Sequence, residues 1–156
     1  MKGFRNIVFL LVSILFSSCK DEYTICDLPK DVNLKSVFYQ TTGGVERAAT
    51  ATSFSLKQLS AADFIYKDVP NVSQFIIPLN PLTDTVKFRI SISSSMPADT
   101  ITYIYTTQLV NLSPVCGDVY VNTITKVSTT YNTLDSIKIS NRSVNTTPAE
   151  NVKIYF

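Results

Sequence analysis

Stretches in which apolar and polar residues alternate recur along this chain from residue 32 to its end. The clearest is residues 85–92 (TVKFRISI), where every second residue is apolar and Lys87 and Arg89 fall between them. A period of two places successive side chains on opposite faces of a strand. Each such stretch therefore predicts a strand with one face turned toward a core.

Seven other stretches have the same character: residues 32–39 (VNLKSVFY), 50–56 (TATSFSL), 74–79 (QFIIPL), 100–107 (TITYIYTT), 118–127 (DVYVNTITKV), 134–139 (LDSIKI) and 151–156 (NVKIYF). Turn-forming residues such as Gly43-Gly44 separate them, and no long stretch has helical periodicity. About seven or eight short strands without helices predict an all-β domain over residues 31–156. We expect an antiparallel β-sandwich, immunoglobulin-like or transthyretin-like, with a small barrel as the alternative.

The first residues have a different pattern. Lys2 and Arg5 precede an apolar run at residues 7–16 (IVFLLVSILF). A run of about ten residues has the length of a secretory signal and is too short to span hydrocarbon. An uncleaved membrane helix is the alternative, and the charged residues 20–22 directly after the run disfavour it.

Residues 15–19 (LFSSC) resemble a bacterial lipobox, although Phe16 departs from the commoner Leu or Val. The resemblance implies a signal peptide at residues 1–18, lipid chains on Cys19, and an anchor and tether at residues 19–30. Each buried acyl methylene contributes about 0.8 kcal/mol, so two or three chains hold a domain on a bilayer. Without the lipid, the same signal would release a secreted protein.

Lys20, Asp21 and Glu22 follow that cysteine. The sequence Cys-Lys-Asp-Glu resembles the signal by which Bacteroidota export lipoproteins to the outer leaflet of the outer membrane. A solvated charged tether would have the same composition. We therefore expect an outer-membrane, lipid-anchored protein that faces the periplasm or the cell surface.

Composition excludes several classes of function. The 156 residues include 14 Lys and Arg, 12 Asp and Glu, and neither His nor Trp. Removal of Lys2 and Arg5 with the signal leaves a neutral balance, so no basic excess favours nucleic acid. Without His, the usual general base and the commonest metal ligand are missing. We expect a protein that is not an enzyme and has no metal or cofactor.

Cys26 and Cys116 are the two thiols that remain once Cys19 carries lipid. In an oxidising compartment such a pair is expected to form a disulfide. A bridge that closes about ninety residues restricts the unfolded chain by up to roughly 4.5 kcal/mol. The alternative, a nucleophilic Cys116, lacks a histidine that could activate it.

Four aspartates stand at or near predicted strand starts: Asp84, Asp99, Asp118 and Asp135. Asp side chains commonly close turns by accepting hydrogen bonds from nearby backbone N–H groups. Clustered carboxylates could instead bind calcium, but antiparallel strands begin at opposite ends of a sandwich and would scatter them. Nothing in the spacing brings a carboxylate pair such as Asp84 and Asp118 to the separation that glycosidases use.

Four tyrosines raise the possibility of glycan stacking: Tyr103, Tyr105, Tyr120 and Tyr131. Tyrosines that alternate with apolar residues more often pack in cores or across strands. A stacking platform would require several of these rings exposed on one face.

Several short motifs resemble one family along nearly the whole chain after Cys19. They are Cys26, Phe38-Tyr39, Pro78-Leu79-Asn80, Asp84-Thr85, Ser113-Pro114, Cys116-Gly117, Asp135-Ser136-Ile137 and residues 150–156 (ENVKIYF). They resemble a Bacteroidota lipoprotein family classified as a domain of unknown function, number 6452. The resemblance implies lipidation and supplies no catalytic residue. We expect a non-enzymatic binding or structural module with a membrane and an envelope protein or glycan as partners; the alternative is a glycan-binding accessory module of a surface polysaccharide system.

Overall fold

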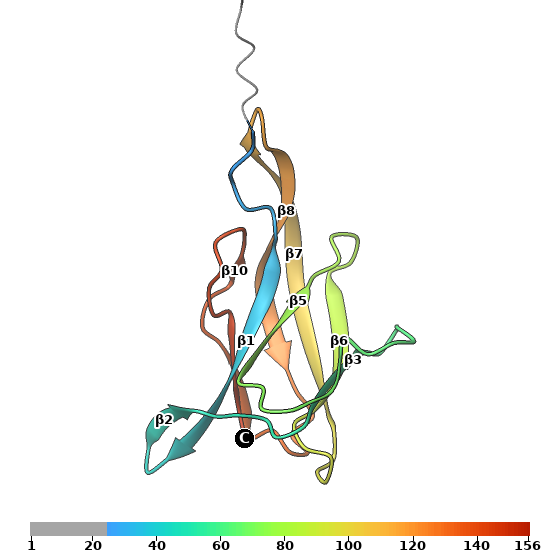
Figure 1. Cartoon of the computed structure of the whole chain (residues 1–156), viewed down its shortest axis with the longest axis vertical. Coiled ribbons are helices and arrows are strands. Elements are labelled where there is room, and N and C mark those ends of the chain that lie inside the picture. The colour runs from blue at the N-terminus through green and yellow to red at the C-terminus, as the bar shows by residue number, and fades with distance from the viewer. Residues whose placement is uncertain (1–24) are drawn as a thin grey trace, which may run out of the picture.

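The computed structural model describes residues 25–156, which form eleven strands (Figure 1). Cys19, Lys20, Asp21 and Glu22 lie outside the described residues. The strands are β1 (Asn33–Thr42), β2 (Val45–Ala48), β3 (Phe54–Gln58), β4 (Tyr66–Val69), β5 (Gln74–Pro78), β6 (Thr85–Ser91), β7 (Asp99–Ser113), β8 (Gly117–Ser128), β9 (Ser136–Ile139), β10 (Ser143–Val144) and β11 (Val152–Tyr155). Within the same residues, no helix is long and apolar enough to cross a membrane.

The strands form two sheets that pack as a sandwich, which confirms the predicted fold class. The first sheet has the order β2-β1-β11-β9, with β5 also paired to β1. The second has the order β10-β8-β7-β6-β3-β4. Phe38 of the first sheet meets Phe54 of the second with ring centroids 5.6 Å apart, so aromatic side chains join the two layers.

The alternating pattern predicts the core side chains well. In β6, Val86, Phe88 and Ile90 are buried while Lys87 and Arg89 are exposed. In β7, Ile101, Tyr103 and Tyr105 are buried in the same way. The hydrophobic effect therefore selects one face of each strand, as the sequence predicts.

One polar contact crosses this core. The hydroxyls of Ser36 on β1 and Tyr103 on β7 lie 3.3 Å apart, and both residues are buried. Burial raises the pKa of Tyr103, and the hydrogen bond opposes part of that rise. The pair gives each buried hydroxyl a partner and leaves Tyr103 a neutral structural residue.

The structure has more strands than the seven or eight that we predicted, because β2, β4 and β10 are short and lack an apolar alternation. β2 (VERA) is exposed at all four positions and is held by its pairing with β1. One pairing also differs from an antiparallel arrangement: β1 and β11 run parallel, with Ser36 opposite Val152. The sandwich is antiparallel elsewhere.

Candidate functional site

The most distinctive feature of the molecule is a long β7–β8 hairpin that extends beyond the other strands of its sheet. β6 pairs with β7 only as far as Ile104, whereas β7 and β8 continue to pair until Ser113 faces Gly117. We call residues 106–121 the arm. In Figure 1 the arm extends toward the end of the molecule at which the described chain begins.

A disulfide joins the tip of the arm to the start of the described chain. Cys116 in the hairpin turn is bonded to Cys26, with Cα atoms 4.9 Å apart, which confirms the predicted bridge. The backbone N–H of Cys116 also donates to the Ser113 hydroxyl at 3.0 Å. The turn ends at Gly117, whose φ of 71° is a conformation that favours glycine. Because its sulfur is bonded and the residue is buried, Cys116 is not a free nucleophile.

Polar cross-strand contacts hold the arm in addition to its backbone ladder. Asn111 donates to Asp118 at 2.7 Å, and Thr107 donates to Asn122 at 2.8 Å. A two-stranded hairpin alone is marginally stable in water. These contacts and the disulfide therefore stabilise a projection that the sandwich core does not support.

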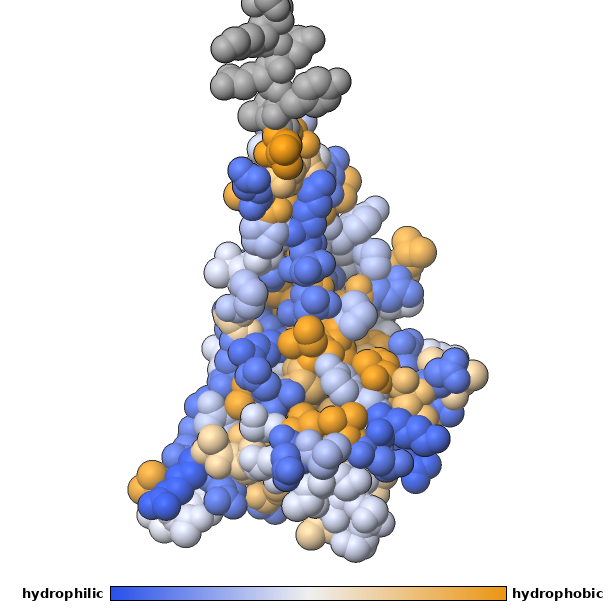
Figure 2. Space-filling view, viewed as in Figure 1, coloured by the Kyte–Doolittle hydropathy of each residue, from blue (hydrophilic) through white to orange (hydrophobic). Residues whose placement is uncertain are grey.

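Apolar side chains are exposed along this end of the molecule (Figure 2). Leu109 and Tyr120 face each other across the two strands and are 57% and 49% exposed. At the tip, Val115 is 50% exposed and Ile25 is 80% exposed. Exposed apolar side chains therefore occur both on the arm and on the segment that is bonded to its tip.

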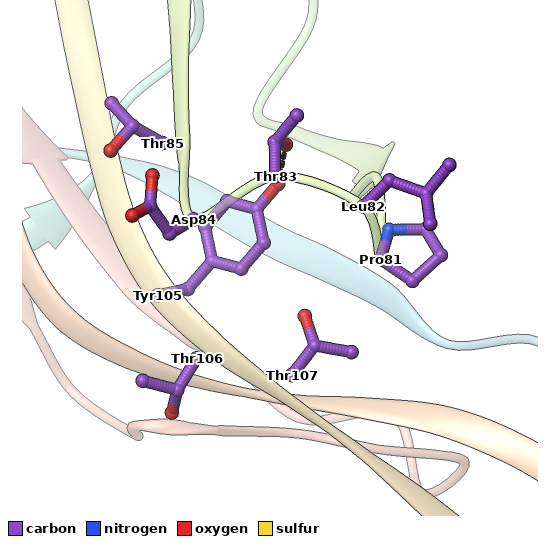
Figure 3. Close-up of a pocket in the computed structure, with 8 residues that line it drawn as sticks. All are labelled: Pro81, Leu82, Thr83, Asp84, Thr85, Tyr105, Thr106 and Thr107. Carbon is purple, nitrogen blue, oxygen red and sulfur yellow. Dashed lines mark hydrogen bonds between the residues drawn. The ribbon is translucent and has the colours of Figure 1, made fainter.

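A shallow depression of about 690 Å³ lies at the base of the arm (Figure 3). Its walls are residues 81–84 from the turn before β6, Thr85 at the start of β6, and residues 105–107 of β7. Tyr105 is buried, and its hydroxyl lies 2.9 Å from that of Thr83 and donates to the Asn80 carbonyl at 3.0 Å. The depression presents threonine hydroxyls and the Asp84 carboxylate beside the apolar surface of Leu82.

The four candidate tyrosines do not form a shared stacking face. Tyr103 and Tyr105 are buried in the core. Tyr120 and Tyr131 are exposed, but one lies near the start of β8 and the other beyond its end. The sequence signal that distinguishes the buried tyrosines from the exposed ones is the alternation of β7, which turns both Tyr103 and Tyr105 inward.

The candidate aspartates also have separate positions, and the described residues contain no cluster of acidic, Cys or His side chains that could hold a metal ion. Asp99 is 1% exposed, and its two carboxylate oxygens accept four hydrogen bonds. The donors are the Thr130 hydroxyl and the backbone N–H groups of Asn132, Thr133 and Leu134. Burial favours a raised pKa for Asp99, but these four bonds outweigh it and lower the pKa overall. Asp99 therefore fixes the loop after β8 and is a structural residue.

A second polar cluster lies on the first sheet, where β2, β1 and β11 are neighbours. The Tyr155 hydroxyl and the Lys153 ammonium both donate to Glu46, at 2.7 and 2.8 Å. Burial, followed by the bond to Glu46, raises the pKa of Tyr155 to about 12. The bonds from Lys153 and then Tyr155 lower the pKa of Glu46. Because these groups bind one another, the cluster holds the β1–β2 hairpin against the sheet.

The fold and the arm define a β-sandwich protein whose N-terminal segment is joined by a disulfide to a projecting hairpin. Residues 50–156 match DUF6452, a family of unknown function, and the chain belongs to that family. The matched region contains the whole arm and Cys116, while Cys26 lies before it. Neither the curated proteins nor the solved structures gave a match.

Proposed function

We propose that this protein is a lipid-anchored lipoprotein of the cell envelope, a non-enzymatic binding or structural module held on the outer membrane through Cys19. The observation that carries the proposal is the disulfide between Cys26 and the arm tip. Cys26 follows Cys19 by seven residues, and an extended chain of that length spans at most about 24 Å. A lipid on Cys19 would therefore keep the arm tip close to the bilayer.

This arrangement gives the arm a mechanical role. Without the disulfide, a lipid at the end of the tether would leave the domain free to rotate about its anchor. The disulfide instead connects the tether to a paired hairpin that is continuous with the second sheet. The sandwich would then stand off the membrane on the arm, with the β1–β2 hairpin at the far end (Figure 1).

Membrane fractionation of cells that express the full chain tests the anchor. We expect the wild-type protein in the membrane fraction, and Cys19→Ala in the soluble fraction, because that substitution removes the acylated sulfur. Cys26→Ser is the matched control, since it removes a cysteine of the same tether and leaves the acylation site intact. A Cys19→Ala protein that remains membrane-bound would refute the lipid anchor.

The side of the membrane is tested with protease added to intact cells. Lys20, Asp21 and Glu22 support export to the outer leaflet, so we expect cleavage of the wild-type protein without lysis. Replacement of all three by Ala should leave the protein protected until the outer membrane is opened. Equal protection of both proteins on intact cells would favour the periplasmic face.

A second candidate function is glycan binding as an accessory module. The depression in Figure 3 supports it, because threonine hydroxyls and the Asp84 carboxylate can hydrogen-bond sugar hydroxyls beside an apolar wall. Affinity electrophoresis in gels containing dextran, xylan or arabinogalactan tests this function. Retardation that Asp84→Asn and Thr106→Ala reduce would support it, and equal mobility in all gels would refute it for these glycans.

A further inference from the structure

Among the residues that the structure describes, no strand lies beside the outer edge of β7 in the arm. The Tyr105 N–H donates to the Asp84 carbonyl at 2.9 Å, which is the last backbone bond from the β6 side. Backbone groups of alternate residues point to the same edge of a strand. The N–H and C=O groups of Thr107, Leu109 and Asn111 therefore face away from β8, where no described strand pairs with them.

The outermost strands of the two sheets are protected in ways that this edge is not, and the outer edge of β8 in the arm, which β10 leaves unpaired before Asn122, carries the charged Asp118. β2, β4 and β9 have four residues each and carry Glu46 and Arg47, Lys67 and Asp68, and Lys138. β10 has only two residues. Charges and short lengths are the usual protection against unwanted strand pairing.

The edge of β5 is covered directly by a side chain. The Tyr66 hydroxyl donates to the Ile76 carbonyl at 3.1 Å and accepts the Ile76 N–H at 3.4 Å. β5 also ends at Pro78, which has no N–H to offer another strand.

By contrast, residues 106–113 (TTQLVNLS) contain no charged residue and no proline. The open edge lies beside the exposed pair of Leu109 and Tyr120. It begins at the depression that residues 81–85 line. An unprotected, uncharged edge next to exposed apolar side chains is a template for strand addition.

We propose that a partner protein of the envelope adds an extended strand to the β7 edge of the arm. The added strand would occupy the position that β6 leaves at Asp84, antiparallel to β7, and make about six backbone hydrogen bonds with Thr107, Leu109 and Asn111. The matching segment is uncharged, since no arm side chain along this edge offers an ion pair. Apolar residues at alternate positions of the added strand would cover Leu109, its direct neighbour on β7.

A second copy of the chain fits this edge less well. Symmetric pairing of two identical edges in a sheet is antiparallel, so the two arm tips would point in opposite directions. Anchors near both tips would then also lie at opposite ends. This step rests on the proposed lipid anchor, whereas the open edge itself does not.

Photo-crosslinking in intact cells tests the proposal, with p-benzoylphenylalanine in place of Leu109 in the full chain. The matched control carries it in place of Val45, which is 56% exposed on the protected β2. We expect a discrete adduct only from position 109, mapped by mass spectrometry to an uncharged, alternating segment of another protein. Thr107→Pro should reduce the adduct at least tenfold, because proline removes an N–H that faces the edge. Thr107→Ala should retain it, since it changes the same side chain and keeps the N–H.

Four results would overturn strand addition by a partner: no adduct at position 109, an adduct with residues 106–113 of a second copy, an adduct with lipid alone, or equal adducts from the Pro and Ala variants. Circular dichroism of the purified variants confirms that each is folded. Fractionation of the same cells reports the anchor separately. A soluble protein that still forms the adduct would refute the anchor and leave strand addition standing.

Discussion

The buried carboxylate of Asp99 allows a quantitative test of how the loop after β8 is fixed. One oxygen accepts from the Thr130 hydroxyl and the Asn132 N–H, and the other accepts from the N–H groups of Thr133 and Leu134. Asp99→Asn replaces one oxygen by an NH₂ group, which is a donor. Whichever way the amide turns, two of the four donors lose their acceptor.

The expected cost follows from that count. A buried polar group left without a partner costs about 1–3 kcal/mol. With two such donors, we expect the free energy of unfolding at pH 7 to fall by about 2–6 kcal/mol. Urea denaturation followed by far-UV circular dichroism and tyrosine fluorescence measures it, since the chain has no tryptophan.

The pH dependence provides a second check. Because the folded-state pKa of Asp99 is lowered, its stabilising contribution is present above the unfolded value of about 3.9 and is lost as the pH falls through the folded pKa. In Asp99→Asn the side chain at position 99 does not titrate, so it contributes no such pH dependence. The difference in unfolding free energy between wild type and Asp99→Asn should therefore be large at pH 7 and should shrink below about pH 4.

A matched control separates this effect from the loss of any strand-initial aspartate. Asp84 is exposed at the start of β6, so Asp84→Asn should change the unfolding free energy by less than about 0.5 kcal/mol. The hydrogen-bond explanation would be refuted if both variants lost the same stability. It would also fail if the loss in Asp99→Asn were equal at pH 7 and at about pH 3.

Two further predictions concern the arm and the first sheet. Replacing Cys26 and Cys116 by Ser should lower the free energy of unfolding by up to about 4.5 kcal/mol and speed amide exchange in the arm. Hydrogen exchange followed by mass spectrometry would contradict this if the arm stayed as protected as before. Tyr155→Phe should raise the pKa of Glu46 toward its ordinary value, because one donor to that carboxylate is lost while Lys153 remains. A carbon-13 titration measures that pKa, and an unchanged value would show that Tyr155 does not stabilise the charged carboxylate.

The core could be predicted because local burial sets its pattern. In β6 the apolar side chains face the sandwich, so the period of two in the sequence gives the inward face directly. The arm could not be predicted in the same way. Beyond Tyr105 the opposite sheet no longer covers β7, and the sequence TTQLVNLS has no alternation that distinguishes strand from loop. The expected strand accordingly ended at Thr107, although β7 continues to Ser113.

Long-range contacts account for the other differences. Asp99 closes a turn, as an aspartate at a strand start is expected to do, but its donors come from a segment 31 to 35 residues later in the chain. Tyr66 covers the edge of β5 through its hydroxyl, and nothing in the spacing of Tyr66 and Ile76 indicates this contact. The disulfide could be predicted because only two cysteines were available once Cys19 was assigned to the lipid. The position of this disulfide at the tip of a long arm could not be predicted, because it depends on how far β7 and β8 continue to pair.

The parallel pairing of β1 with β11 has a consequence for the order in which the fold can be completed. Lys35 and Asn151, which exchange hydrogen bonds beside this pairing, are 116 residues apart. Synthesis proceeds from the N-terminus at about 5–20 residues per second, so β1 is made on the order of ten seconds before its central neighbour exists. During that interval the first sheet lacks β11, the strand that lies between β1 and β9. A chain that emerges from its N-terminus should thus stay protease-sensitive until β11 has emerged, and dependence on chaperones should be greatest at that stage.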